Sequence, residues 1–319
     1  MTYLRGTTFN EQTVVADLAL TGAPAWREQP ERASHIGAFV RSARQTLAPS
    51  AVRSFFAELR ANDRLLHHFG WALLLSVPVF AAISYLNPGT AEFANPWFKP
   101  IKFAISFATF VWTVSLFLGQ LRVPTRLVQV VRVAMTGSVI VEMLSLAAQA
   151  WRNANLSGSP TLADWTIQQM TTAMVSVNTA VLIALLVIFC GKKTWVRITD
   201  AAMVLAIRLS VVIFLAGNAV GGYMLARGSH TVGAKDGGPG LPFLNWSIVA
   251  GDLRVAHFIA IHAIQIVPMA AWLLWQMAPL PALRTRKILV CVAALFTALL
   301  VGGTFVQAML AQPMIALAR

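Results

Sequence analysis

Residues 251–268 read GDLRVAHFIAIHAIQIVP, an apolar stretch that nevertheless carries an aspartate, an arginine, a glutamine and two histidines. On a helix that turns by about 100° per residue, four polar side chains fall within an arc of roughly 140°, namely Arg254, His257, His262 and Gln265. The opposite side of this helix is apolar. The stretch is therefore predicted to form a membrane-spanning helix with one polar face, and that face needs partners on other helices.

The composition of the whole chain agrees with a membrane protein. The 319 residues are 57% hydrophobic and 12% charged, and the mean hydropathy is +0.66. Since a soluble domain has about 25% charged residues, we expect an all-α, polytopic transmembrane bundle whose main partner is the lipid bilayer. The net charge of +13 does not indicate a nucleic-acid partner, because the basic residues cluster in short loops between apolar spans.

Seven apolar spans are predicted, near residues 66–86, 98–119, 128–150, 168–190, 201–225, 252–276 and 286–310. Each has about 20 or more mostly apolar residues, which is enough to cross a hydrocarbon core of about 30 Å. Lysine and arginine are more frequent in the loops after the second, fourth and sixth spans than in the alternate loops. The positive-inside rule therefore places the N-terminus in the cytoplasm and the C-terminus in the periplasm.

The chain is expected to divide into a cytoplasmic tail, residues 1–64, and a transmembrane domain, residues 65–319. Apolar residues at helical spacing within 32–62 predict two short amphipathic helices on the inner membrane surface. The tail is also a possible docking site for a protein partner. Residues 226–251 form a glycine-rich periplasmic loop, for which a lid and a flexible spacer are both open.

Polar side chains recur on one side of several predicted spans. The second span carries Lys99 and Lys102, and the third carries Glu142 and Gln149. Because unpaired polar groups in a bilayer cost free energy, these faces are expected to meet in a polar pocket that opens to the periplasm. The candidate catalytic residues are Glu142, His257 and His262. The candidate ligand-binding residues are Lys99, Lys102, Gln149, Asn178, Tyr223, Arg254 and Gln265.

Most of these residues also have a structural interpretation. The two lysines lie in the first turns of a span, where lysine often extends towards lipid headgroups. Glu142 is expected to form an ion pair with a lysine or with Arg254, or else to carry protons. Asn178 is typical of a hydrogen bond between helices. In addition, the pair Gly217 and Gly221 predicts close helix packing, and Pro268 predicts a kink.

The two histidines of the sixth span raise the question of haem or another metal. Haem held by two histidines needs imidazoles at similar depth on facing helices, whereas His67 and His68 lie at the opposite end of the predicted bundle. His257 and His262 are about 140° apart on a helix, so a shared metal needs help from another residue such as Glu142. Haem or a metal at these histidines, of unknown identity, stays open beside hydrogen bonding to ligand, protein or protons.

Three motifs resemble an uncharacterised family of bacterial multi-pass inner-membrane proteins. They are NPWFKPIKF at residues 95–103, GDLRVAHF at 251–258 and HAIQIVP at 262–268. The resemblance covers the seven spans and leaves out the tail. It implies a bacterial inner-membrane location and brings no known activity.

The sequence leaves three functions open. The first is a membrane-embedded enzyme or redox protein that acts on a small or lipidic ligand, because the predicted pocket collects groups able to bind anions and move protons. The second is a transporter, channel or sensor for a small anion, which the cationic excess favours. The third is a structural or assembly subunit of a membrane complex, in which the polar residues only hold helices together. The sequence does not decide whether the chain is an enzyme.

Overall fold

The computed structural model describes residues 49–87, 95–155, 161–191, 200–277 and 280–315. These residues belong to one compact unit, Thr46–Arg319. The first of the two predicted amphipathic helices and most of the predicted tail lie outside the described residues.

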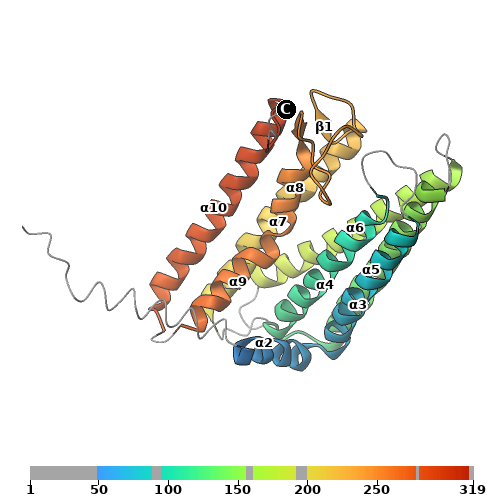
Figure 1. Cartoon of the computed structure of the whole chain (residues 1–319). Coiled ribbons are helices and arrows are strands. Elements are labelled where there is room, and N and C mark those ends of the chain that lie inside the picture. The colour runs from blue at the N-terminus through green and yellow to red at the C-terminus, as the bar shows by residue number, and fades with distance from the viewer. Residues whose placement is uncertain (1–48, 88–94, 156–160, 192–199, 278–279, 316–319) are drawn as a thin grey trace, which may run out of the picture. The chain divides into compact units, whose positions relative to one another are not determined.

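Within the described residues the chain forms helices and one very short hairpin (Figure 1). The elements are α2 (Pro49–Asn62), α3 (Arg64–Leu86), α4 (Phe98–Gly119), α5 (Thr125–Asn155), α6 (Leu162–Cys190), α7 (Ala201–Arg227), β1 (Thr231–Val232), β2 (Gly251–Asp252), α8 (Leu253–Ile261), α9 (Ala263–Trp275) and α10 (Leu283–Met309). Among these residues six helices are long and apolar enough to cross a membrane, and there are seven spans if the bent pair α8–α9 is counted as one. The predicted all-α, polytopic bundle is confirmed.

Short polar side chains fix where several helices begin. Asp63 accepts a hydrogen bond from the N–H of Leu66 and starts α3, and Asp200 and Asp252 cap α7 and α8 in the same way. Such caps satisfy N–H groups that have no partner inside the helix. At the other end of α7, Gly228 adopts a φ of 65°, which a residue without a side chain reaches at little cost, and this turn starts the loop that follows.

The helices pack mainly on their neighbours in sequence. α3 packs on α4, α5 packs on α6, and α7 packs on α8, α9 and α10. The buried apolar side chains form two clusters. One draws mostly on α3 to α7, and the other draws on α7 to α10, so that α7 belongs to both.

The second predicted amphipathic helix is present as α2, and its apolar face packs against the bundle. Leu59 is fully buried. The ring of Phe56 lies 5.1 Å from that of Trp112 in α4, and the ring of Phe55 lies 5.5 Å from that of Trp272 in α9. The location of α2 on the inner membrane surface stays a prediction.

The sixth span is broken, but not at the predicted proline. α8 and α9 are bent by 42° at His262, whereas Pro268 lies inside α9. The bend coincides with a change of neighbours, because α8 packs on α7 and α10 while α9 also reaches α4. The structure thus adds a break that the sequence did not predict and sets His262 at the hinge, whereas the kink at Pro268 stays a prediction.

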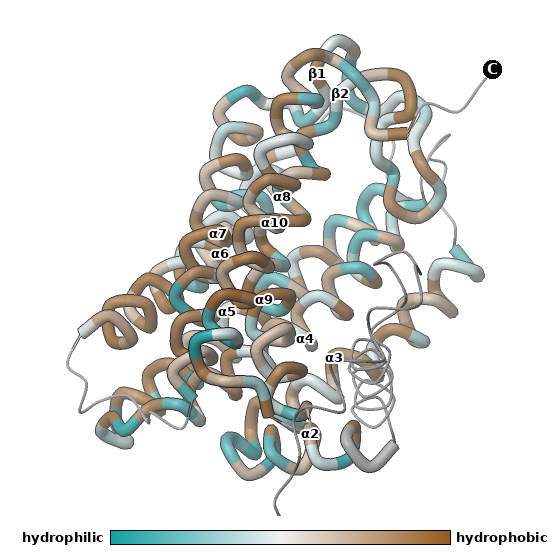
Figure 2. Tube along the Cα trace, turned by 90° about the vertical axis from the view of Figure 1, so that its left-hand side faces the viewer, coloured by the Kyte–Doolittle hydropathy of each residue, from teal (hydrophilic) through white to brown (hydrophobic). Residues whose placement is uncertain are grey.

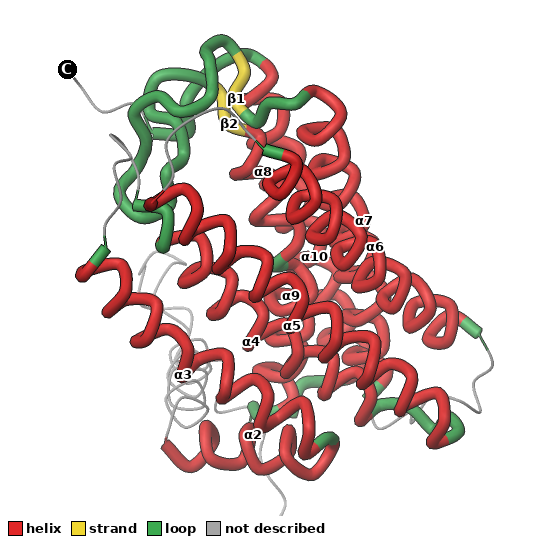
Figure 3. The backbone as a smooth tube through the Cα atoms, turned by 90° about the vertical axis from the view of Figure 1, so that its right-hand side faces the viewer, coloured by secondary structure: helices red, strands yellow, loops and turns green. Residues whose placement is uncertain are grey.

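The two ends of the bundle differ in structure. We call the end that carries β1, β2 and residues 228–252 the loop end, and the opposite end, which carries α2, the α2 end (Figure 3). Hydrophobic residues follow α9 and α10 along their length, whereas hydrophilic residues gather around the β1–β2 hairpin and α2 (Figure 2).

Candidate functional site

The glycine-rich segment between α7 and α8 has hydrogen-bonded structure of its own. β1 and β2 pair antiparallel, with Thr231 opposite Asp252, and a further bridge joins Gly240 to Ser247. The carboxylate of Asp236 accepts a hydrogen bond of 2.9 Å from the N–H of Thr231. The segment predicted as a lid or a spacer is therefore a folded connection between α7 and α8. We call this segment, residues 228–252, the cover.

Asp252 and Arg254 tie this cover to the start of α8. The Asp252 side chain is 1% exposed and lies 2.6 Å from the Arg254 guanidinium. It also accepts hydrogen bonds from the backbone N–H groups of Arg254, at 3.0 Å, and Ser247, at 2.8 Å. The guanidinium in turn donates to the backbone carbonyl of Asn245. Arg254 thus holds the cover with a charge that Asp252 neutralises.

Lys102 reaches the same cover from α4. Its ammonium group donates a 3.2 Å hydrogen bond to the carbonyl of Leu244 and lies 5.8 Å from the ring centre of Phe243. Phe98, one turn earlier in α4, packs its ring 5.4 Å from that of Phe243. Within the described part of the chain Lys102 has no ion pair with a carboxylate. Two cations, from α4 and α8, therefore converge on adjacent carbonyls of one loop.

One turn further along α4, Ser106 meets the hinge of the sixth span. The Ser106 hydroxyl lies 3.4 Å from Nε2 of His262. The His262 ring lies 4.4 Å from the ring of Phe258, which is 42% exposed and in contact with Trp246 of the cover. We call Lys102, Ser106, Leu244, Arg254 and His262 the loop-end site. It combines positive charge, two groups that can hydrogen-bond, and an apolar neighbour.

A second polar chain joins three helices at the loop end. The ammonium group of Lys99 donates to the side-chain oxygen of Gln149 at 3.3 Å, and the Gln149 amide donates to Gln168 at 3.4 Å. These side chains connect α4, α5 and α6. The structure therefore brings the predicted pair Lys99 and Gln149 together, on a partly exposed surface.

Glu142 has a different partner from the one predicted. It is 1% exposed, and its carboxyl group accepts a 2.7 Å hydrogen bond from the amide of Asn178 in α6. The oxygen of Asn178 accepts in turn from the hydroxyl of Ser138 at 2.6 Å. Among the described residues Glu142 forms no ion pair with a lysine or with Arg254, because α5 turns Glu142 towards α6 and Arg254 pairs with Asp252.

His257 and His262 point to different neighbours, as their spacing predicted. Nδ1 of His257 lies 2.8 Å from the carbonyl of Gly217 in α7, and a side chain added at Gly221 would lie 2.9 Å from its ring. The two glycines therefore admit the imidazole to a tight α7–α8 contact, which confirms the predicted close packing. The candidate catalytic residues each have a separate partner, on α6 for Glu142, α7 for His257 and α4 for His262.

Of the two remaining candidates, Tyr223 lies apart from the loop-end site, whereas the N–H of Gln265 donates to the carbonyl of His262 at 3.0 Å. Tyr223 is 39% exposed, with its ring 6.4 Å from that of Phe305 in α10 and the Arg227 guanidinium 5.6 Å from its centre. Gln265 lies on α9 in the turn after His262, where its side-chain oxygen is buried.

Among the described residues no group of three or more His, Cys, Asp and Glu side chains is placed to hold a metal ion. The Nδ1 atom of His257 is engaged by a backbone carbonyl, and the Nε2 atom of His262 by a hydroxyl. Haem or a metal at these two histidines stays a prediction.

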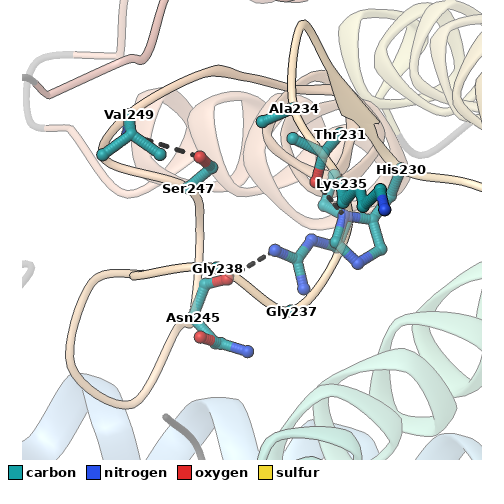
Figure 4. A pocket seen from close by; sticks show the side chains of 10 residues that line it. His230, Thr231, Ala234, Lys235, Gly237, Gly238, Asn245, Ser247 and Val249 are labelled. Carbon is teal, nitrogen blue, oxygen red and sulfur yellow. Dashed lines mark hydrogen bonds between the residues drawn. The ribbon is translucent and has the colours of Figure 1, made fainter.

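The cover itself contains a shallow hollow of about 320 Å³, a volume that includes its opening. Asn245 lies on one side of it and His230, Thr231 and Lys235 lie on the other (Figure 4). Burial lowers the pKa of His230, and the charge of Arg254 lowers it further, against the opposing effect of Asp236. Burial alone would raise the pKa of Asp236, but hydrogen bonds from Thr231 and Ser229 lower it to about 2. His230 therefore favours its neutral form beside an ionised Asp236.

No protein-family model, curated protein or solved structure matches the chain. The resemblance to bacterial inner-membrane proteins stays a prediction, and the functional argument depends on the geometry of the site.

The sequence did not indicate the backbone partners of the two cations. Backbone carbonyls such as those of Leu244 and Asn245 do not depend on side-chain type, and Ser106 is one of several hydroxyl-bearing residues in the second span. The one usable signal is Asn245, because asparagine adopts a positive φ more readily than most residues, and its φ is 58°.

Proposed function

We propose that this multi-pass membrane protein binds a small or lipidic ligand at the loop-end site. Lys102 provides a positive charge, Arg254 provides a guanidinium group that is already paired with Asp252, and Ser106 and His262 provide hydrogen bonds. In the proposed orientation the loop end faces the periplasm of a bacterial inner membrane. The observation that carries the proposal is the convergence of Lys102 and Arg254, from two helices, on adjacent carbonyls of the same loop.

The surroundings of Lys102 support binding over a purely structural role. At the α2 end, buried Arg286 pairs with the carboxylate of Asp200 at 2.7 Å, and half-buried Arg208 donates to the backbone carbonyl of Phe189. Lys102 is also half-buried and donates to a neutral carbonyl, but its carbonyl lies next to the one that a second cation, Arg254, contacts. A charge that is removed from water without a counter-charge lowers stability, so its retention needs another reason, and a ligand supplies one.

The arrangement favours binding over proton-transfer chemistry. General acid–base catalysis needs the acid and base within hydrogen-bond reach of one reacting group. Glu142 is instead engaged in the α5–α6 contact and His257 in the α7–α8 contact. His262 alone, among the candidate catalytic residues, belongs to the loop-end site.

Native mass spectrometry of the full chain in mild detergent tests the proposal. We expect the wild-type protein to retain a small non-protein mass that Lys102→Gln and Ser106→Ala lose. Lys287→Gln changes an exposed lysine at the α2 end and is the matched control for Lys102→Gln. His262→Ala should also lose the mass, and its matched control is His68→Ala, which changes an exposed histidine at the α2 end. Because Ser106→Ala removes only a hydroxyl group, it serves even if the other variants unfold. Absence of any retained mass, or equal retention by all variants, would overturn the proposal.

A further inference from the structure

The tip of the cover, residues 241–247, is held from both sides by groups outside it. Lys102 of α4 donates to the carbonyl of Leu244, and Arg254 of α8 donates to that of Asn245. The N–H of Ser247 donates to Asp252 at the base of the cover. The tip therefore bridges α4 and α8 across the loop-end site.

The backbone of the tip adopts a conformation that its residues do not favour. Phe243 has a φ of 63° and Asn245 a φ of 58°. For a bulky residue such as phenylalanine, a positive φ is strained and persists only where surrounding contacts impose it. Here those contacts are the two cations, the Phe98 ring and hydrogen bonds inside the tip, such as that from the Asn245 N–H to the Leu241 carbonyl at 2.7 Å. Loss of the Lys102 contact would remove one of the restraints on the tip.

The backbone carbonyls that the two cations contact in the tip are weak hydrogen-bond partners. A backbone carbonyl is a neutral acceptor that leaves the ammonium charge without a counter-charge, whereas an anion supplies both a hydrogen bond and a counter-charge. Arg254 is already paired with the carboxylate of Asp252, so a bound anion would stabilise the charge of Lys102 more than that of Arg254. An anionic group that reaches Lys102 would compete directly with the carbonyl of Leu244.

Building on the proposed function, we propose that the ligand carries an anionic group, a phosphate, sulfonate or carboxylate, that takes the place of the Leu244 carbonyl at Lys102. Binding then releases residues 241–247, which act as a strap over the empty site. The exposed ring of Phe258 beside His262 offers contact to an apolar part of the same ligand. A lipid headgroup and a free small anion share this chemistry, and the experiment distinguishes them.

Amide hydrogen exchange of the full chain tests the strap. The protein is placed in nanodiscs of phosphatidylcholine, and two probes are compared, inorganic phosphate in solution and replacement of part of the lipid by phosphatidylglycerol. We expect the effective probe to raise the exchange rates of the Leu241 and Asn245 amides about 10-fold, because these amides are bonded inside the tip. The amides of the β1–β2 hairpin serve as the internal control and should not change.

Variants of the lysine complete the test. Lys102→Gln should show fast exchange of the tip without any probe and no further response, while Lys102→Arg should respond like the wild type. Lys287→Gln, at the α2 end, should behave as the wild type throughout. If Lys102→Gln does not fold, the comparison of the two probes on the wild-type chain decides.

The possible failures are distinct. If a probe raises the thermal stability of the wild type but the tip amides exchange at the same rate or more slowly, the strap is wrong and the site stands. If the mass retained in native mass spectrometry proves to be uncharged, the anionic class is wrong. If no mass is retained and neither probe has an effect, the proposed function fails together with the inference.

Discussion

Glu142 occupies its buried position with two neutral companions, Asn178 and Ser138. The Asn178 amide group donates to Glu142 and accepts from Ser138, so one side chain satisfies polar atoms on both sides. A buried polar atom that loses its partner costs more free energy than a whole hydrogen bond contributes. Asn178 is thus the residue on which the α5–α6 contact depends.

The first prediction concerns this contact. Asn178→Ala should lower the free energy of unfolding by about 1–3 kcal/mol, because Glu142 is left without its hydrogen-bond donor. Glu142→Gln keeps an acceptor oxygen towards Asn178 and should change stability by less than about 1 kcal/mol. Thermal unfolding in detergent measures both, with Thr304→Ala of α10 as the control, because the Thr304 hydroxyl bonds only within its own helix. Equal losses for the two variants would mean that the charge of Glu142, and not the hydrogen bond, stabilises the contact.

The second prediction concerns pH and His230. Its pKa in the folded protein lies below the usual value of about 6.5, so the unfolded chain binds more protons as the pH falls through that value. The stability that neutral His230 contributes is therefore present above pH ~6.5 and is lost as the pH falls towards the folded pKa. The melting temperature of the wild type should fall more between pH 7.5 and pH 5 than that of His230→Gln. Parallel curves for the two proteins would contradict the prediction.

At the scale of helices, the contact between α7 and α8 depends on a missing side chain. A Cβ atom added at Gly217 would lie 2.6 Å from the Cβ of Ala260 and 3.1 Å from the backbone nitrogen of Ile261. Gly222, also in α7, has no atom within 4 Å of the same position. The two glycines provide a matched pair in one helix.

The third prediction follows from that pair. Gly217→Ala should destabilise the protein by about 1–3 kcal/mol, because the backbone of α8 must move away. Gly222→Ala should stabilise it by about 0.5–1 kcal/mol, since alanine is the better helix former. Thermal unfolding of both variants beside the wild type is the measurement. A gain of stability from Gly217→Ala would show that α7 and α8 are not in close contact.

The elements themselves were predictable from the sequence, whereas their bends and caps were only partly so. Seven apolar runs define seven spans because crossing a bilayer requires about 20 apolar residues, and this requirement leaves few alternatives. The break at His262 was missed because a bend depends on which neighbours the two halves contact, and proline is only one cause of bending. The folded cover was missed for a similar reason, as glycine-rich composition does not specify pairing.

For the whole molecule, the proposed orientation gives the fourth prediction. Cys190 and Cys291 are both exposed and are first replaced by serine. In intact bacterial cells, a membrane-impermeant thiol reagent should label Lys235→Cys in the cover but not Lys287→Cys at the α2 end. Lysis should make the second position reactive. The reverse pattern would invert the orientation, and labelling of both from outside would contradict a spanning bundle.

The candidate site was predicted less completely than the bundle. The sequence placed Lys102, Arg254 and His257 near one end, because topology fixes depth. It could not say that Glu142 would turn towards Asn178, or that the cations would meet backbone carbonyls. Depth follows from position along a span, whereas partners follow from the rotation of each helix about its own axis. That rotation is decided by packing among residues far apart in the chain.

α7 contributes to both apolar clusters, with Val211 in the first and Ile213 in the second. Since a chain is synthesised from its N-terminus, the helices up to α7 enter the membrane before α8, α9 and α10 exist. The first cluster can then assemble while the other face of α7 contacts lipid. Since lipid is as apolar as α8, α9 and α10, this exposure of α7 costs little free energy before those helices pack. The bundle therefore assembles in two steps, first α7 with the preceding helices and then α7 with α8, α9 and α10. The loop-end site forms only in the second step, because it needs both α4 and α8.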